Sequence, residues 1–327
     1  MSNPQRLFPV TVAADSVMRF DPRRGLARWM PRWMMAGFTL FVACTVHAQE
    51  LEPGAYSPAP VGFNIALASY THSSGDLAFD ASVPITEASA SINQAVFGYV
   101  RTLDVAGRQA SVAFALPYAR GDLEGLLFGE PASAYRSGIA DPRIRLAINL
   151  YGSPALTPKE FATRPPDKWI FGTSLGISLP LGQYDPDKLI NIGQNRWAFK
   201  PEFGLSRTAG KWVVEIDAGA WFYLDNTDFY GGQTRHRDPL VSTQWHIIYN
   251  FRPRMWLALD ANYYSGGRTT LNGVQKNDEQ HNSRMGLTFA LPLNQQHSLK
   301  FSYSRGAITN IGADFASYGV AWQYAWR

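Results

Sequence analysis

Apolar and polar residues alternate with a period of two along about twelve segments of this chain, each about ten residues long and followed by a turn or a polar loop. A period of two is typical of an extended strand, because successive side chains point to opposite faces. The segments are 61–71, 93–103, 109–118, 141–151, 169–180, 195–207, 212–225, 240–251, 255–265, 282–292, 298–308 and 315–326. We therefore expect an all-β chain of about twelve antiparallel strands.

The two faces of these segments differ in a way that indicates a membrane barrel. In 212–225 one face carries Trp212, Val214 and Ile216, and the other carries Glu215 and Asp217. Elsewhere the second face is mostly Gly, Ala, Ser, Asn and Gln, whereas a soluble sandwich exposes a face rich in Lys and Glu. We expect a transmembrane antiparallel up-and-down β-barrel in the bacterial outer membrane, with lipid outside and a narrow polar lumen. The alternative is a periplasmic all-β domain.

The connections alternate in length, as short periplasmic turns and long external loops do in such barrels. The short turns are 104–108, 208–211, 252–254 and 293–297, and the long polar loops are 72–92, 118–138, 181–194, 226–238 and 266–281. Two of the expected loops, 72–92 and 118–138, are apolar enough to fold inward as a plug or to hold a hydrophobic ligand at the mouth. The residues concerned are Leu77, Phe79, Leu123, Leu126, Leu127 and Phe128.

The first 48 residues account for the whole net charge of +4, because they hold six Arg and two Asp. The mature part is therefore neutral and has no basic run, so we expect no nucleic-acid partner. Residues 1–48 have the features of a cleaved signal peptide: a basic stretch over 23–32, an apolar core over 34–46 and a small-residue site before Gln49. Met18 is an alternative start. Acylation at Cys44 and a twin-arginine signal at Arg23-Arg24 are the rival interpretations.

Two further segments complete the expected domain organisation. Residues 49–60 form a Pro-rich periplasmic N-terminal segment, of which Pro53 to Pro60 could instead enter the barrel from below. Residues 61–327 form the outer-membrane barrel.

Ionisable residues on the polar faces are the candidate site. In a barrel of this size they cannot all be surrounded by bulk water. They form either a network of paired charges that stiffens the interior or a filter along a permeation path. These residues are Asp141, Arg143, Arg145, Lys200, Glu202, Glu215, Asp217, Asp260, Arg284 and Lys300.

Catalytic and metal signatures are weak. Residues 172–176 match the G-x-S-x-G nucleophile pattern, but that pattern needs a strand-to-helix turn and here it falls within a strand. The His residues lack metal-binding spacings. Asp185 and Asp187 could contact calcium, although a turn-forming role is favoured. Cys44 is the only cysteine and lies in the leader, so the mature chain offers no thiol chemistry. We expect neither an enzyme nor a cofactor.

Several stretches resemble a known family. They are 52–62 (EPGAYSPAPVG), 73–79 (SSGDLAF), 138–150 (GIADPRIRLAINL), 179–201 (LPLGQYDPDKLINIGQNRWAFKP), 237–240 (RDPL), 263–269 (YYSGGRT) and 282–284 (NSR). The chain resembles the outer-membrane proteins described as "Putative MetA-pathway of phenol degradation". The resemblance implies a membrane barrel associated with the uptake of aromatic or other hydrophobic compounds.

The function expected from these observations is passive uptake of small, hydrophobic or aromatic solutes through an outer-membrane channel. The alternative is a non-conducting barrel with a structural or ligand-sensing role. The expected partners are the solute, outer-membrane lipid and, during biogenesis, the barrel-assembly machinery. The sequence leaves the solute, the pore radius and the oligomeric state open.

Overall fold

A computed structural model describes residues 51–78, 85–164 and 168–327. Phe79 and the expected signal peptide lie outside these residues. The large sheet contains β1 (Asn64–Ala78), β2 (Ile85–Val105), β3 (Arg108–Leu127), β4 (Glu130–Ile139), β5 (Arg143–Tyr151), β6 (Trp169–Ser178), β7 (Ala198–Ala209), β8 (Trp212–Tyr223), β11 (Leu240–Arg252), β12 (Met255–Gly266), β15 (Gln280–Pro292), β16 (His297–Ile308) and β17 (Gly312–Trp326).

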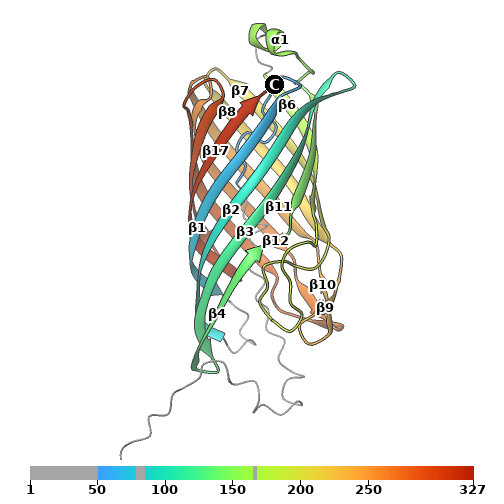
Figure 1. Cartoon of the computed structure of the whole chain (residues 1–327), viewed down its shortest axis with the longest axis vertical. Coiled ribbons are helices and arrows are strands. Elements are labelled where there is room, and N and C mark those ends of the chain that lie inside the picture. The colour runs from blue at the N-terminus through green and yellow to red at the C-terminus, as the bar shows by residue number, and fades with distance from the viewer. Residues whose placement is uncertain (1–50, 79–84, 165–167) are drawn as a thin grey trace, which may run out of the picture. The chain divides into compact units, whose positions relative to one another are not determined.

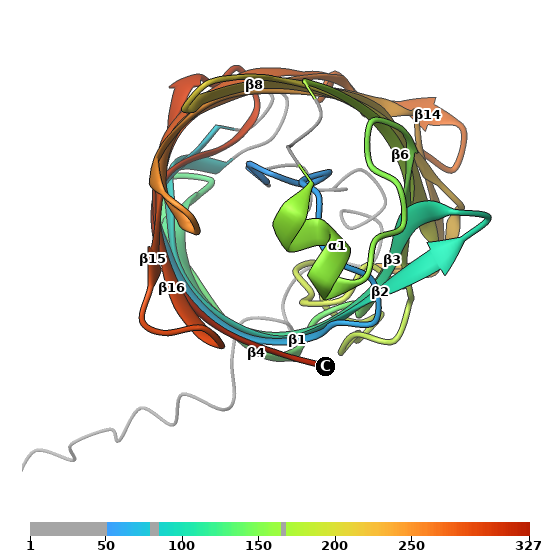
Figure 2. The same ribbon diagram turned by 90° about the horizontal axis from the view of Figure 1, so that it is seen from above.

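This sheet closes on itself as an antiparallel barrel. Strand β1 pairs with both β2 and β17, which joins the two ends of the chain's strand order. Strand β4 pairs only with the second half of β3, whose first half pairs with β5, so the other twelve strands form the closed wall. Viewed along its axis in Figure 2, the wall is a continuous ring, and Figure 1 shows the strands tilted across it. The predicted barrel of about twelve strands is confirmed.

The outer face of the barrel is an apolar band, as lipid requires. Phe97 of β2 is 64% exposed, and its neighbours at even-numbered positions point inward. On β8, Trp212, Val214 and Ile216 are exposed, whereas Glu215 and Asp217 are buried. The predicted assignment of the two faces of this strand is therefore confirmed, and the barrel spans a membrane with its charges inside.

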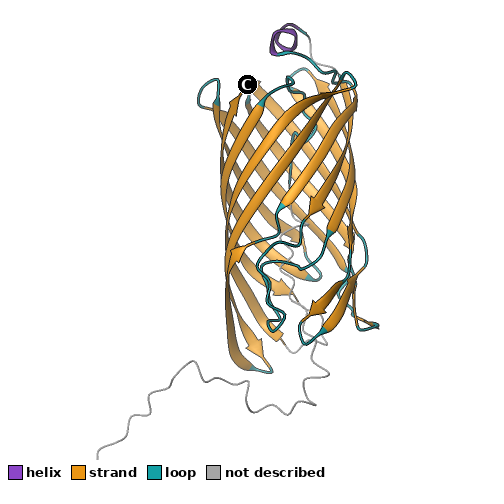
Figure 3. Ribbon diagram, turned by 45° about the vertical axis from the view of Figure 1, so that its right-hand side comes forward, coloured by secondary structure: helices purple, strands orange, loops and turns teal. Residues whose placement is uncertain are grey.

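Two of the expected loops, 72–92 and 118–138, are mostly strand, so that part of the prediction is wrong. Strand β1 continues to Ala78, and β3 and β4 form a long hairpin with a two-residue turn at Phe128 and Gly129. On the outer face of β3 the apolar residues stop at Tyr118 and are followed by the exposed Arg120, Asp122 and Glu124. The hairpin therefore extends past the lipid into water, where a strand needs no apolar outer face (Figure 3).

Smaller elements lie beyond the ends of the wall. Four short strands form a second sheet: β9 (Asn226–Phe229), β10 (Gln233–Arg237), β13 (Thr269–Leu271) and β14 (Val274–Gln275). The connection between β5 and β6 contains α1 (Pro158–Thr163), which begins after Thr157 with a capping box closed by Glu160. No helix among the described residues is long and apolar enough to cross a membrane.

Candidate functional site in the barrel lumen

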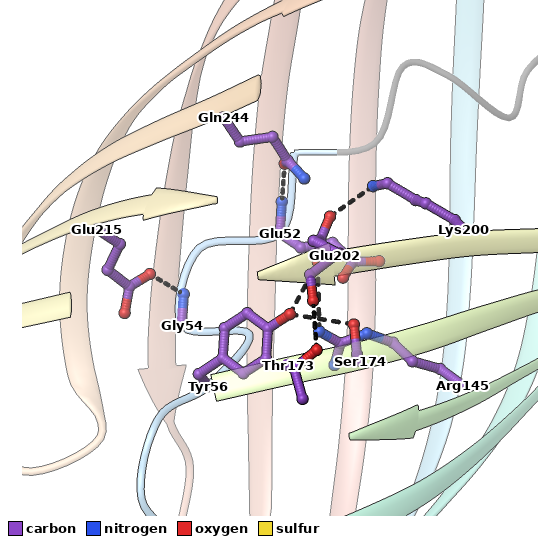
Figure 4. A network of polar contacts seen from close by, with 10 residues as sticks. All are labelled: Glu52, Gly54, Tyr56, Arg145, Thr173, Ser174, Lys200, Glu202, Glu215 and Gln244. Atoms are coloured by element: carbon purple, nitrogen blue, oxygen red, sulfur yellow. Dashed lines mark hydrogen bonds and ion pairs between the residues drawn. The ribbon is translucent and has the colours of Figure 1, made fainter. Parts of the chain in front are cut away.

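The Pro-rich N-terminal segment, residues 51–60, runs inside the barrel. Next to it, the amide of Val61 donates to the carbonyl of Leu156, at the end of the barrel that carries the short turns. Deeper in, the Gly54 amide donates to Glu215 Oε2 (2.6 Å) and the Glu52 amide to Gln244 Oε1 (3.2 Å), as Figure 4 shows. Of the two placements considered for Pro53 to Pro60, the structure has the one within the barrel.

Glu202 on β7 is the centre of the polar network that holds this segment. Its Oε2 lies 2.6 Å from Lys200 Nζ, and its Oε1 lies 3.5 Å from Arg145 Nη2. The same Oε1 accepts a hydrogen bond from the Tyr56 hydroxyl at 3.2 Å, while that hydroxyl lies 3.0 Å from Ser174 Oγ. Because Glu202 is 4% exposed, its charge depends on these partners rather than on water.

A second buried group links β11, β12 and β15. Asp260 Oδ1 lies 2.7 Å from His246 Nδ1, and Asp260 Oδ2 accepts a hydrogen bond from the Thr288 hydroxyl at 2.6 Å. Both Asp260 and His246 are 0% exposed. The Glu52 carboxylate interacts electrostatically with His246 and with Lys300 on β16, and also with Arg145 and Lys200. Glu52 therefore connects basic residues on distant parts of the wall.

Asp141, Arg143 and Arg284 lie nearer the end of the barrel where β3 and β4 form their hairpin. Asp141, just before β5, accepts from the amides of Gly182 (2.9 Å) and Gln194 (2.8 Å) and so anchors the β6–β7 loop, residues 179–197. Arg284 on β15 donates to the carbonyl of Phe315 at 2.9 Å. Arg143 also occupies an inward position, on β5. Asp217 on β8 is nearer the short-turn end, where it is the register partner of Gly204 on β7. The structure thus brings seven of the ten candidates into hydrogen-bonding or electrostatic interactions with Glu52, Tyr56 or His246. They are Arg145, Lys200, Glu202, Glu215, Asp217, Asp260 and Lys300.

The opposite part of the wall, made by β17, β1, β2 and β3, is uncharged where it faces the lumen within the membrane. Its inward positions include Ile65, Leu67, Ser69, Thr71, Gln94, Val96, Gly98, Val100, Ser111, Ala113, Ala115, Gly319, Ala321, Gln323 and Ala325. We call this the uncharged wall, and we call β5 to β16 the charged wall. The described residues of the N-terminal segment from Ala59 to Glu52 make their hydrogen bonds with β3 and the charged wall.

An apolar cluster continues the uncharged wall toward the hairpin end. It contains the buried residues Ala90, Ile92, Leu123 and Phe315, with Leu77, Ala134, Ile190 and Ala313 packed against them. Ile190 comes from the β6–β7 loop, so this loop reaches across the opening. Of the residues expected at the mouth, Leu77 and Leu123 belong to the cluster, whereas Leu127 and Phe128 are exposed at the hairpin tip and Leu126 lies next to them.

Sequence reasoning missed several residues of the site. Glu52 and Tyr56 lie in the Pro-rich segment and were not singled out as site residues from its sequence, whereas Ser174 was expected within a strand, as part of the G-x-S-x-G stretch. His246 could have been placed in the lumen, because Val241, Trp245 and Ile247 define the outward face of its strand. Asp185, in the β6–β7 loop, accepts from the Asp187 amide and pairs with Lys188, as a turn does. Among the described residues no group of three or more acidic, His or Cys side chains is placed to hold a metal ion.

Comparison with known proteins gives a family and several solved structures of similar fold. The sequence profile of the family described as "Putative MetA-pathway of phenol degradation" matches residues 71–324. None of the curated proteins compared with the chain matches it. The COG4313 outer membrane channel from Pseudomonas putida F1 is similar in fold, with a TM-score of 0.73 and 21% identity over 85% of this chain and 100% of that chain.

Two autotransporter barrels are more distant. The transport unit of AIDA-I from Escherichia coli has a TM-score of 0.49 and 9% identity, over 86% of this chain and 95% of that chain. The β domain of the Bordetella autotransporter BrkA has a TM-score of 0.47 and 11% identity, over 81% of this chain and 100% of that chain.

Proposed function

Because the chain belongs to the family described as "Putative MetA-pathway of phenol degradation", we propose that its barrel is an outer-membrane channel for the passive uptake of small hydrophobic or aromatic solutes. The shared fold with an outer membrane channel supports this proposal. The proposal involves no chemical reaction. Ser174 lies in the middle of β6, within hydrogen-bonding distance of Tyr56, rather than on the strand-to-helix turn that a serine nucleophile of this motif needs.

The observation that carries the proposal is the uncharged wall and its continuation into the apolar cluster. A neutral aromatic solute gains from contact with apolar side chains and loses when it must separate paired charges. On the charged wall, Glu202 and Asp260 are already bonded to basic or hydroxyl partners. A solute path beside Leu67, Val96 and Val100 avoids disturbing these pairs. During biogenesis we expect the assembly machinery of the outer membrane to insert the barrel.

The alternative is a non-conducting barrel with a structural or ligand-sensing role. The N-terminal segment inside the lumen is compatible with that role if the segment never leaves. The two functions differ in the effect of removing residues 51–60: a channel conducts more, whereas a structural barrel stays closed or unfolds.

The test is solute uptake by vesicles whose outer leaflet contains lipopolysaccharide, which slows direct diffusion of aromatic solutes. We expect phenol to enter vesicles with the protein faster than erythritol, a sugar alcohol of similar size. Val96→Asp places a charge on the uncharged wall and should slow phenol severalfold, whereas the nearly isosteric Val96→Thr should change uptake little. Equal phenol uptake with and without the protein, also after deletion of residues 51–60, would refute the channel.

A further inference from the structure

The ring of Tyr56 rests on two glycines that face each other across neighbouring strands. Gly172 on β6 and Gly204 on β7 are register partners, and both point into the lumen. A methyl group at Gly172 would overlap Cδ1 of the Tyr56 ring, and a methyl group at Gly204 would overlap Cδ2 and Cε2 on its other edge. The recess therefore exists only because both positions lack a side chain.

The polar end of the recess fits a hydroxyl on an aromatic ring. The Tyr56 hydroxyl donates to Glu202 Oε1 and lies within hydrogen-bonding distance of Ser174 Oγ. Lys200 holds the other oxygen of Glu202, so this acceptor is in place whether or not a ring is present. Arg145 Cζ lies 5.0 Å from the ring centroid, which is the distance of a cation–π contact. These residues contact both the ring and the hydroxyl of Tyr56. A phenol molecule consists of the same two parts.

The backbone of the segment is held by other groups. Asn149 Nδ2 donates to the carbonyl of Tyr56 at 3.1 Å, the Gly54 amide donates to Glu215, and the Ala59 amide donates to Gln109 Oε1 at 2.8 Å. A purely apolar side chain at position 56 would fill the gap above the two glycines without a hydroxyl. The match to a phenol is thus more specific than anchoring the backbone requires.

We propose that Gly172, Ser174, Glu202, Gly204 and Arg145 form a binding site for phenols in the lumen, which Tyr56 occupies as a built-in ligand. This phenol recess rests on the proposed function, because a free phenol reaches it only through the lumen. It also gives the G-x-S-x-G stretch a role: its first glycine forms the floor of the recess and its serine binds the hydroxyl.

Tyr56 competes with a free phenol for the recess. A tethered group acts at an effective concentration on the order of millimolar. Free phenol therefore binds the natural protein weakly, and removal of the Tyr56 ring should reveal the site.

The experiment measures binding of 4-fluorophenol by fluorine NMR to the purified full-length protein in detergent. Tyr56→Ala should bind the probe at least about tenfold more tightly than the natural protein, because the tethered competitor is gone. Tyr56→Phe keeps a ring in the recess and should bind no more tightly than the natural protein. The methyl ether 4-fluoroanisole cannot donate to Glu202 and should bind Tyr56→Ala about tenfold more weakly than 4-fluorophenol, as expected for loss of a hydrogen bond to a charged acceptor.

The matched control fills the recess. Adding Gly204→Ala to Tyr56→Ala should abolish the tight binding, and it leaves partition of the probe into the micelles unchanged. Heat-modifiable migration on gels reports whether each barrel is folded. If the Gly204 variant does not fold, Gly172→Ala takes its place, because it blocks the other edge of the ring.

The outcomes separate the site from the channel. If Tyr56→Ala binds both probes equally, or no better than the double variant, the recess only anchors the segment and the proposal is overturned. Fast phenol uptake by Tyr56→Ala without such binding would leave the channel intact and remove the site. Specific binding without any uptake would leave the site intact and remove the channel.

Discussion

The charged wall and the uncharged wall of the same barrel present opposite side-chain chemistry to the lumen. On the charged wall, carboxylates such as Glu202 and Asp260 are buried and bonded to basic and hydroxyl groups, and the N-terminal segment is bonded among them. On the uncharged wall, small and aliphatic residues such as Val96 and Ala115 have side chains without charges or hydrogen-bonding groups. Charges in a narrow interior must be paired, and pairing fixes them in place. We therefore expect a neutral solute to pass along the wall that has the fewest groups to pair.

The sharpest test of this contrast truncates one residue on each wall. Glu202→Ala leaves Lys200 and Arg145 without their buried carboxylate, and we expect it to lower the free energy of unfolding by about 3 kcal/mol. Val96→Ala removes two methyl groups from the uncharged wall and should lower it by about 1 kcal/mol. Urea unfolding of barrels folded into phospholipid vesicles measures both. Equal losses would show that the charge network does not stabilise the interior.

The β6–β7 loop touches both walls and allows the contrast to be measured within one segment. Asp141→Ala removes the acceptor of the Gly182 and Gln194 amides. We expect the free energy of opening at these amides to fall by about 2 kcal/mol, because hydrogen bonds to a buried carboxylate are lost. Hydrogen exchange followed by mass spectrometry reads the change. Asp187→Ala, at an exposed position of the same loop, is the control and should leave the exchange of both amides unchanged.

Ile190 is the contact of this loop with the apolar cluster of the other wall. Ile190→Ala removes a partly buried side chain, so we expect a loss of about 1 kcal/mol in the stability of the loop, smaller than that of Asp141→Ala. The same exchange measurement compares them. A larger loss for Ile190→Ala would mean that the loop is held mainly by the uncharged wall.

Helix α1 lies on neither wall and gives the smallest effect. The hydrogen bond from the Thr157 hydroxyl, followed by that from the Thr157 amide, lowers the pKa of Glu160. A lowered carboxyl pKa stabilises the helix start above the ordinary pKa, and this contribution is lost as the pH falls through the lowered value. We expect acid to loosen α1 through this group, and Thr157→Ala to bring the pKa of Glu160 back toward its ordinary value. Carboxyl carbon NMR of Glu160 follows the titration, and an unchanged pKa in Thr157→Ala would contradict the capping box as its cause.

The sequence predicted each face of the strands that cross the lipid, because lipid outside and a lumen inside impose a period of two on every one of them. Where the lipid ends this signal ends, and the β3–β4 hairpin, with Arg120 and Asp122 on its outer face, was therefore mistaken for a loop. The candidate charges were found by their inward position, but their partners were not. Glu202 was expected to face the lumen, but its hydrogen bond with Tyr56 could not be predicted, because it connects residues that are 146 positions apart.

The amino-acid sequence by itself determined that this chain forms a closed wall with apolar residues toward lipid, since each strand has the alternation of apolar and polar residues within its own segment. The tertiary structure decided which inward residues meet, because those meetings depend on the register around the ring and on the path of residues 51–60 through it. The pairing of Gly172 with Gly204 under the Tyr56 ring is such a meeting: two missing side chains on adjacent strands make space for a third residue that enters from the N-terminal segment.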